Sequence, residues 1–225
     1  MQSSDDLIKD FFLQQAELFT DEFYFGEKEE AEIPMNVLDW NELEPKVLTC
    51  TKCELSKTRT KVVFGYGKRD AELLFIGKAP GEREDLQGEP FVGRAGHLLD
   101  DILAAIQLNR EQVYIANILK CRPPKNRTPH AGEIANCEPY LVNQIDLIKP
   151  ALIVCLGLTA AKTLLRVECT LRQMREKIYN YHGVDLVVTI IPPHYSGIQV
   201  SRSMPGRISR KYKKCLNKKR GAYSA

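Results

Sequence analysis

Four of the seven cysteines have a spacing that suits metal ligands. Cys50 and Cys53 form a C-x-x-C pair beside polar residues, and Cys121 and Cys137 follow much later in the chain. Four thiolates suit either a zinc ion or an iron–sulfur cluster, and spacing alone does not choose between them. The alternative of scattered core cysteines is disfavoured, because a C-x-x-C pair among polar residues rarely serves only as core.

The other cysteines carry no such pattern. Cys155 lies within an apolar run and is expected in the core, whereas Cys169 and Cys215 have no partner at ligand spacing and stay unassigned. The start of the chain lacks the basic and apolar regions of a signal peptide, and no run reaches the roughly 18 apolar residues of a membrane span. We therefore expect a cytoplasmic protein without membrane contact, in which disulfides are disfavoured. We also expect a monomer.

A first candidate binding loop covers residues 77–96 and reads GKAPGEREDLQGEPFVGRAG. Its glycines allow backbone N–H groups to approach a ligand closely, and a helix that begins near Gly93 can receive an anion at its N-terminus. Taken alone, the composition fits an ordinary surface turn about as well as it fits contact with a nucleotide or phosphate.

A second polar loop begins at Cys121 and reads CRPPKNRTPH. Arg122, Lys125 and Arg127 lie among prolines that stiffen the backbone, so this loop is a candidate phosphate-contacting surface, and the alternative is a solvated basic loop. Asn117 lies at the preceding strand end, where its amide can either bind a base edge or form a turn.

These candidates follow short apolar runs that alternate with helical stretches, which is typical of a parallel sheet covered on both faces. The expected strands are residues 73–76, 113–115, 152–156 and 186–188, and the expected helices are 93–106, 131–148 and 158–165. The predicted fold class is therefore three-layer α/β, with a central, mainly parallel, four-stranded sheet flanked by helices. Ligands of such sheets bind at the carboxyl ends of the strands, where both loops begin.

The chain of 225 residues is long enough for one good-sized core. We expect a short helix over residues 5–18 and an acidic surface connection over 21–44. The predicted organisation is an N-terminal helix and connection (1–45), one domain (46–189) and a basic tail (190–225).

Taken together, these segments resemble the iron–sulfur-containing family-4, or thermophile-type, uracil-DNA glycosylases. The resemblance runs from about Thr49 to Thr189 and rests on the C-x-x-C pair, the loop of residues 77–96, the stretch NILKCRPPKNRTP from Asn117 and Cys137. It implies an enzyme of base-excision repair that hydrolyses the N-glycosidic bond of uracil in DNA.

The resemblance also implies roles for particular residues. A [4Fe–4S] cluster would be held by Cys50, Cys53, Cys121 and Cys137, with a mainly structural role. Phe91 would stack on an extruded uracil, and Asn117 would hydrogen-bond the base. The surrounding contacts to uracil and DNA would come from Gly77, Ala79, Gly81 and Arg122.

The sequence departs from this family at Lys78, where members usually carry an acidic residue. A lysine cannot align water as a carboxylate does, and its charge would lie beside a developing cation. We therefore expect Lys78 to weaken catalysis.

The second departure lies in the C-terminal region, where the family has a motif close to His-Pro-Ser/Ala-x-Leu-Leu-Arg that His194 resembles only superficially. Back-translation read from the third base of the Thr189 codon permits YHPPALLRNP, and the same frame across Met204 to Lys211 permits AWEDIKK. We therefore predict that a one-base frameshift near Thr189 caused residues 190–225 to be translated in a different reading frame. The alternative is a genuine DNA-binding arm, because this segment is basic and lacks acidic residues.

Two other functions stay open. One is a catalytically dead iron–sulfur protein that still binds DNA. The other, less favoured, is a zinc-stabilised nucleotide-binding protein of unrelated chemistry, which would lack the absorbance of an iron–sulfur cluster.

Overall fold

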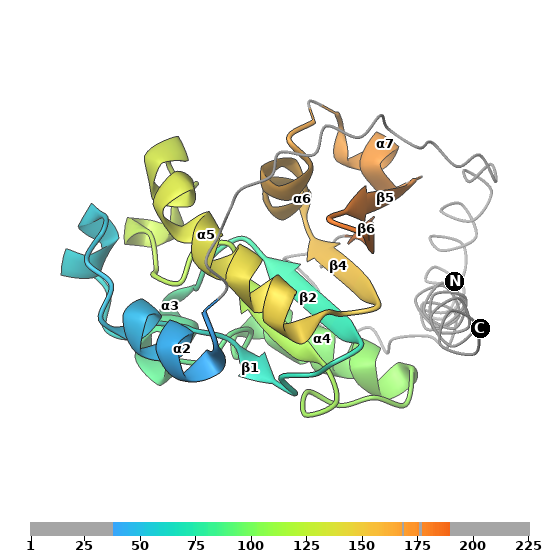
Figure 1. Cartoon of the computed structure of the whole chain (residues 1–225), viewed down its shortest axis with the longest axis horizontal. Coiled ribbons are helices and arrows are strands. Elements are labelled where there is room, and N and C mark those ends of the chain that lie inside the picture. The colour runs from blue at the N-terminus through green and yellow to red at the C-terminus, as the bar shows by residue number, and fades with distance from the viewer. Residues whose placement is uncertain (1–37, 168, 176, 190–225) are drawn as a thin grey trace, which may run out of the picture.

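The computed structural model describes residues 38–167, 169–175 and 177–189, and in that part six strands form a single sheet (Figure 1). The strand order is β1-β3-β2-β4-β6-β5. The strands are β1 (Tyr66–Gly67), β2 (Leu73–Gly77), β3 (Tyr114–Asn117), β4 (Leu152–Leu156), β5 (Ile178–Tyr181) and β6 (Val184–Thr189).

The four central strands β3, β2, β4 and β6 are mutually parallel, and the edge strands β1 and β5 are antiparallel to their neighbours. All five residues of β2 and all four of β3 are buried. Parallel strands of this kind are covered on both faces, which is why they read as continuous apolar runs in the sequence.

Alternate side chains of the central strands pack into two different cores. On β2, Leu74 and Ile76 join the larger core, whereas Leu73 and Phe75 face the other one. Because successive side chains of a strand point to opposite faces, this alternation divides the domain into three layers.

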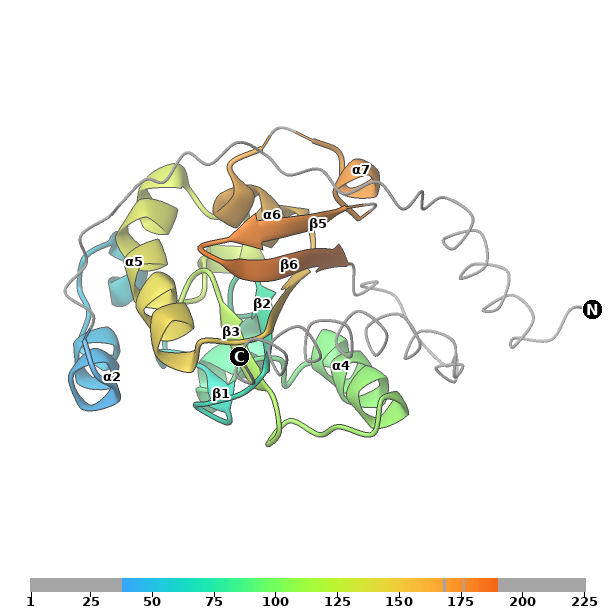
Figure 2. The same ribbon diagram turned by 45° about the vertical axis from the view of Figure 1, so that its right-hand side comes forward.

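Helices cover both faces of the sheet. Figure 2 shows α5 (Ala131–Ile148) and α4 (Arg94–Ala105) on opposite sides of β2 and β3. The other helical elements are α2 (Trp40–Leu48), η1 (Glu54–Lys57), α3 (Glu82–Gln87), η2 (Pro124–Asn126), α6 (Leu158–Leu165) and α7 (Leu171–Arg175).

The structure confirms the four predicted strands and the three predicted helices, and adds β1 and β5 at the sheet edges. Strand β1 has only two residues, and the partly exposed β5 lacks a continuous apolar run, so neither shows a strong sequence signal. The expected surface connection is wrong at its end, because α2 begins at Trp40 with a capping box between Asp39 and Glu42.

Helix α2 spans the domain boundary that we predicted at residue 46. Trp40 packs its ring 6.1 Å from that of Phe64 and 5.8 Å from that of Tyr114, which joins the helix to the sheet. The predicted helix of residues 5–18 and the basic tail of 190–225 lie outside the described residues.

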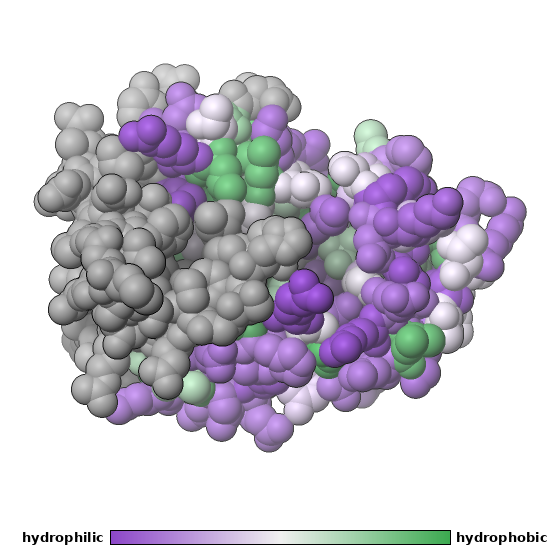
Figure 3. Space-filling view, turned by 180° about the vertical axis from the view of Figure 1, so that it is seen from behind, coloured by the Kyte–Doolittle hydropathy of each residue, from purple (hydrophilic) through white to green (hydrophobic). Residues whose placement is uncertain are grey.

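Within the described part of the chain, no helix is long and apolar enough to cross a membrane. Seen from behind, the coloured surface is mostly hydrophilic, with a small hydrophobic patch near its upper edge (Figure 3). The buried apolar residues form the two cores and a third, smaller cluster in which Leu43 and Val47 of α2 pack with Phe64 and Tyr140.

Candidate active site

Gly77, Phe91 and Asn117 meet at the carboxyl ends of β2 and β3. A Cβ atom placed on Gly77 would stand 2.4 Å from Asn117 Oδ1 and 2.5 Å from Phe91 Cζ. No side chain fits between them, so glycine is required at residue 77. The structure therefore brings together the aromatic ring and the amide that the family resemblance predicts as a base-binding pair.

Phe91 has a left-handed backbone conformation, with φ of +55°. This region is uncommon for a residue other than glycine and persists only where its surroundings enforce it. Gly96 is part of those surroundings, because a Cβ there would stand 1.7 Å from the Phe91 carbonyl oxygen. The first turn of α4 thus packs directly against the backbone of Phe91.

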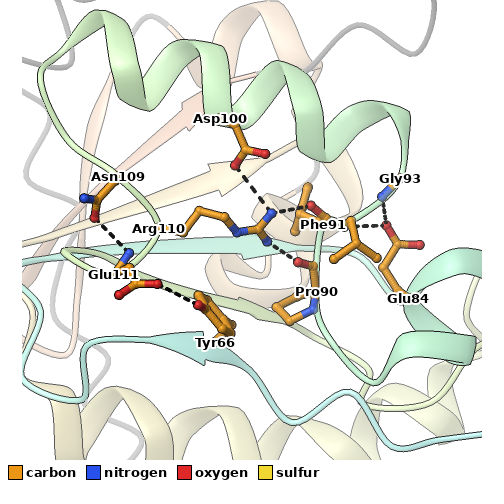
Figure 4. Close-up of polar contacts among 10 residues, drawn as sticks. Tyr66, Glu84, Pro90, Phe91, Gly93, Asp100, Asn109, Arg110 and Glu111 are labelled. Atoms are coloured by element: carbon orange, nitrogen blue, oxygen red, sulfur yellow. Dashed lines mark hydrogen bonds and ion pairs between the residues drawn. The ribbon is translucent and has the colours of Figure 1, made fainter.

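Two charged side chains of opposite sign bind the backbone on either side of this residue (Figure 4). Glu84 Oε1 accepts hydrogen bonds from the N–H groups of Val92 at 3.1 Å and Gly93 at 2.9 Å. The guanidinium of Arg110 donates to the carbonyl oxygens of Phe91, at 2.7 Å, and Pro90. Carbonyls thus meet a cation, and amides meet an anion.

Lys78 is half-buried and directly follows β2, and its carbonyl accepts a hydrogen bond from Leu119 N at 3.2 Å. The carboxylate of Glu84 is bound to backbone amides and that of Glu82 to Arg122 at 3.6 Å. Both loop carboxylates therefore already have partners, and neither is an unpaired substitute for the acidic residue that the family resemblance predicts at residue 78.

The other two predicted residues of the first loop, Ala79 and Gly81, contribute to packing and to the start of a helix. Ala79 packs against the larger core. Gly81 is the N-cap of α3, and a Cβ there would stand 2.7 Å from Glu84 Oε2. Gly81 therefore leaves room for the Glu84 carboxylate.

Two of the three basic residues of the second loop pair with carboxylates of the protein. Arg122 pairs with Glu82 and donates to Asn126 Oδ1 at 2.9 Å. Arg127 binds Glu133 through two hydrogen bonds, at 2.9 and 2.6 Å. Arg127 thus stabilises its own loop, and the only one of the three predicted cations that is exposed is Lys125.

The four predicted ligand cysteines are near neighbours. Burial raises the pKa of the Cys121 thiol, Arg59 opposes this, and the nearby Cys53 and Cys50 thiols raise the pKa further. Burial likewise raises the pKa of Cys137 to about 11, and Cys121 and Cys50 contribute to the rise. Thiols that influence one another in this way share one region, between the C-x-x-C segment and α5.

Two nitrogen donors point at these sulfur atoms. The Arg59 guanidinium donates to Cys121 Sγ at 3.2 Å and to the Cys50 carbonyl at 2.7 Å, and Lys120 N donates to Cys137 Sγ at 3.3 Å. Among the described residues, however, no group of three or more His, Cys, Asp or Glu side chains has the geometry to hold a single metal ion. In a tetrahedral zinc site each thiolate sulfur would lie about 2.3 Å from the metal.

Lys120 lies beside these cysteines and is 1% exposed. Its ammonium donates to the Asn117 carbonyl at 3.0 Å and to Gln144 Oε1 at 2.6 Å, and in the described part of the chain no carboxylate pairs with it. Burial lowers its pKa to about 8, while Cys137 and Cys121 oppose the shift. A buried cation needs a compensating negative charge, and thiolates would supply it.

Sequence reasoning missed Glu84 and Arg110. Glu84 stands inside the loop quoted above, but nothing local distinguishes it from Glu82 or Asp85. Arg110 lies 19 residues after Phe91 and has no motif. Cys155 is fully buried, as expected.

Comparison with known proteins agrees with this geometry. The sequence profile of the uracil DNA glycosylase superfamily matches residues 64–219, which is more than half of the chain. The chain therefore belongs to the uracil DNA glycosylase superfamily.

Within this superfamily, the chain is similar to several type-4 uracil-DNA glycosylases. The chain is 49% identical over 138 residues to a type-4 uracil-DNA glycosylase of Archaeoglobus fulgidus, covering 60% of this chain and 69% of the relative. It is 41% identical over 156 residues to that of Saccharolobus solfataricus, covering 67% and 72%. It is 51% identical over 115 residues to that of Thermotoga maritima, covering 51% of this chain and 60% of the relative.

Proposed function

We propose that this chain is a type-4 uracil-DNA glycosylase, which hydrolyses the N-glycosidic bond of uracil in DNA during base-excision repair. The observation that carries the proposal is the convergence of Phe91 and Asn117 on Gly77. The similarity to type-4 enzymes at 41–51% identity supports the same assignment.

The reaction explains why such a pocket is needed. A uracil inside a duplex is out of reach, so its nucleotide must be flipped out at a cost of a few kcal/mol, which stacking and base-edge hydrogen bonds offset. Phe91 offers the stacking face, and the Asn117 amide offers a donor and an acceptor to the base edge. Because bond breaking leaves negative charge on uracil and positive charge on the sugar, a fixed donor to the base stabilises the transition state.

We further propose a [4Fe–4S] cluster held by Cys50, Cys53, Cys121 and Cys137. The four neighbouring thiols, the two N–H donors aimed at sulfur and the buried Lys120 charge fit a thiolate-bound cluster. When bound, the cluster would cross-link the C-x-x-C segment, the second loop and α5. Lys120, which directly precedes the proposed ligand Cys121, holds Asn117 in place because its ammonium donates a hydrogen bond to the Asn117 carbonyl.

Iron and acid-labile sulfide, measured per chain together with the visible absorbance, test the cluster. Cys137→Ala should lower both, whereas the same change at the core residue Cys155 should leave them unaltered. Stoichiometric zinc in place of iron would reject the cluster.

The activity test is single-turnover cleavage of an oligonucleotide with one uracil, beside the same oligonucleotide with thymine. Cleavage only at uracil, strongly reduced by Phe91→Ala or Asn117→Ala, is the expected result. Cleavage that neither substitution changes would overturn the site assignment.

The second candidate function is a DNA-binding remnant without turnover, which Lys78 favours. A version with the C-terminal reading frame restored separates the two, since activity only in that version would assign the defect to residues 190–225. Absence of activity in both, with DNA binding retained, would favour the remnant. The gene sequence tests the frameshift directly, because codons incompatible with the shifted motif would reject it.

A further inference from the structure

Phe91 can stack on a base only if its loop keeps the ring beside Asn117. The left-handed backbone conformation of Phe91 places the ring there, but it is unfavourable for a residue with a side chain. Relaxation to an ordinary conformation would move the ring away from Asn117. A side chain that holds this backbone conformation therefore contributes to the pocket, although it need not touch the base.

Arg110 has the geometry of such a side chain. Its planar guanidinium reaches the carbonyl oxygens of both Pro90 and Phe91, so one rigid group defines the orientation of two consecutive peptide planes (Figure 4). A lysine ammonium lacks this fork and cannot hold both carbonyls in the same relative orientation.

The position of Arg110 is itself constrained by α4 and β1. Asp100 on α4 pairs with the guanidinium at 3.4 Å, and the ring of Tyr66 on β1 lies 5.6 Å from the guanidinium carbon. Tyr66 in turn donates to Glu111 Oε1 at 3.0 Å. The side chain of Arg110 is 20% exposed, so water only partly screens these contacts.

We propose that Arg110 is a positioning residue for base recognition, which holds Phe91 in its stacking orientation while Asp100 aligns the guanidinium. This rests on the proposed function, because it gives Phe91 the role of base stacking. Arg110 acts through the Phe91 backbone, so its contribution should disappear when the Phe91 ring is absent.

The test measures binding of uracil-containing DNA with 2-aminopurine beside the uracil, whose fluorescence reports base extrusion, together with single-turnover cleavage. Arg110→Lys is expected to weaken binding about tenfold, the usual scale for losing a charge-assisted hydrogen bond. The enzyme concentration giving half-maximal cleavage should rise, with the saturating rate largely unchanged. Arg69→Lys is the matched control, because Arg69 also pairs with a carboxylate and lies over an aromatic ring, 4.9 Å from Trp40, away from the pocket.

A double-mutant cycle decides whether Arg110 acts through Phe91. The Lys substitution should have little further effect in a Phe91→Ala background, because no ring remains to be positioned. An equal loss in both backgrounds would overturn the proposal and indicate a direct DNA contact. No loss in the wild-type background would overturn it as well.

Asp100→Asn provides a second variant if Arg110→Lys does not fold. It keeps the packing of α4 and removes the ion pair, so a smaller loss that again depends on Phe91 is expected. Wild-type protein that binds uracil and thymine DNA equally would instead reject the proposed function, and the positioning role with it. The two failures are thus distinguishable by the behaviour of the unmodified chain.

Discussion

Gly77 and Asn117 are register partners on the parallel strands β2 and β3, and the Asn117 side chain occupies the space where a side chain on Gly77 would begin. The amide is thus directed across the end of β2 toward the Phe91 ring. One missing methyl group on one strand determines where the functional group of the next strand can lie.

Gly77→Ala should therefore strongly impair base recognition, because the added methyl group disturbs the pocket itself. The added methyl must displace Asn117 Oδ1 or the Phe91 ring, and displacements near 1 Å can cost about 100-fold in rate. Single-turnover cleavage checks this, with Gly132→Ala as control because a Cβ at Gly132 meets nothing within 4 Å. Equal activity of both variants would contradict the crowded pocket.

Glu84→Ala should destabilise the Phe91 loop more than Glu84→Gln. The alanine leaves the Val92 and Gly93 amides without their acceptor, at a cost of about 2 kcal/mol, whereas glutamine keeps one oxygen in place. Chemical denaturation measures the difference in free energy of unfolding. Glu54→Ala is the control, since the side chain of Glu54 is 82% exposed and its ion pair contributes about 0.5 kcal/mol.

Lys78→Glu should raise uracil excision in protein with an intact C-terminal motif. A carboxylate can align water and stabilise positive charge on the sugar, both of which the ammonium opposes. Lys68→Glu, at an exposed ion pair with Asp70, makes the same charge change elsewhere and should not alter the rate. Unchanged excision by Lys78→Glu would show that residue 78 does not limit catalysis.

Lys120→Met should lower the free energy of unfolding by about 2–4 kcal/mol, because the Asn117 carbonyl and Gln144 Oε1 lose a buried donor. Thermal unfolding with iron content measured alongside tests this. Lys57→Met is the control, since that side chain is 71% exposed. Equal stability of the two variants would indicate that the buried ammonium is not needed.

Glu133 should contribute to stability only above the acid range. The Arg127 guanidinium is the main cause that holds the pKa of Glu133 below its usual value near 4.5, and the His130 amide adds to this against burial. A carboxyl with a lowered pKa in the folded state stabilises the protein above the unfolded-state pKa. That contribution is lost as pH falls through the lowered value.

The melting-temperature difference between wild type and Glu133→Gln should therefore be constant well above pH 4.5, the usual pKa of glutamate, and shrink as the pH falls below it. Thermal unfolding across this range measures it. A difference that grows as the pH falls would contradict the sign of the shift.

Much of the fold can be predicted from patterns within short stretches of the sequence. Runs such as residues 73–76 are apolar throughout, so they predict buried parallel strands, and the helical stretches between them predict the covering layers. The C-x-x-C pair and the loop of residues 77–96 likewise carry their chemistry in short spacings. By contrast β1, with two residues, depends on pairing with β3 and has no pattern of its own.

The sequence by itself determined the three-layer class and the candidate cysteines, and its family resemblance proposed Phe91 and Asn117 for one pocket. Only the tertiary structure showed that Arg122 and Arg127 are engaged by Glu82 and Glu133. It alone revealed the left-handed Phe91 and its contact with Arg110. The physical reason is that hydrophobic periodicity depends on residues that are neighbours in the sequence. Ion pairs and an enforced backbone angle depend on contacts between distant segments, which only the folded chain brings together.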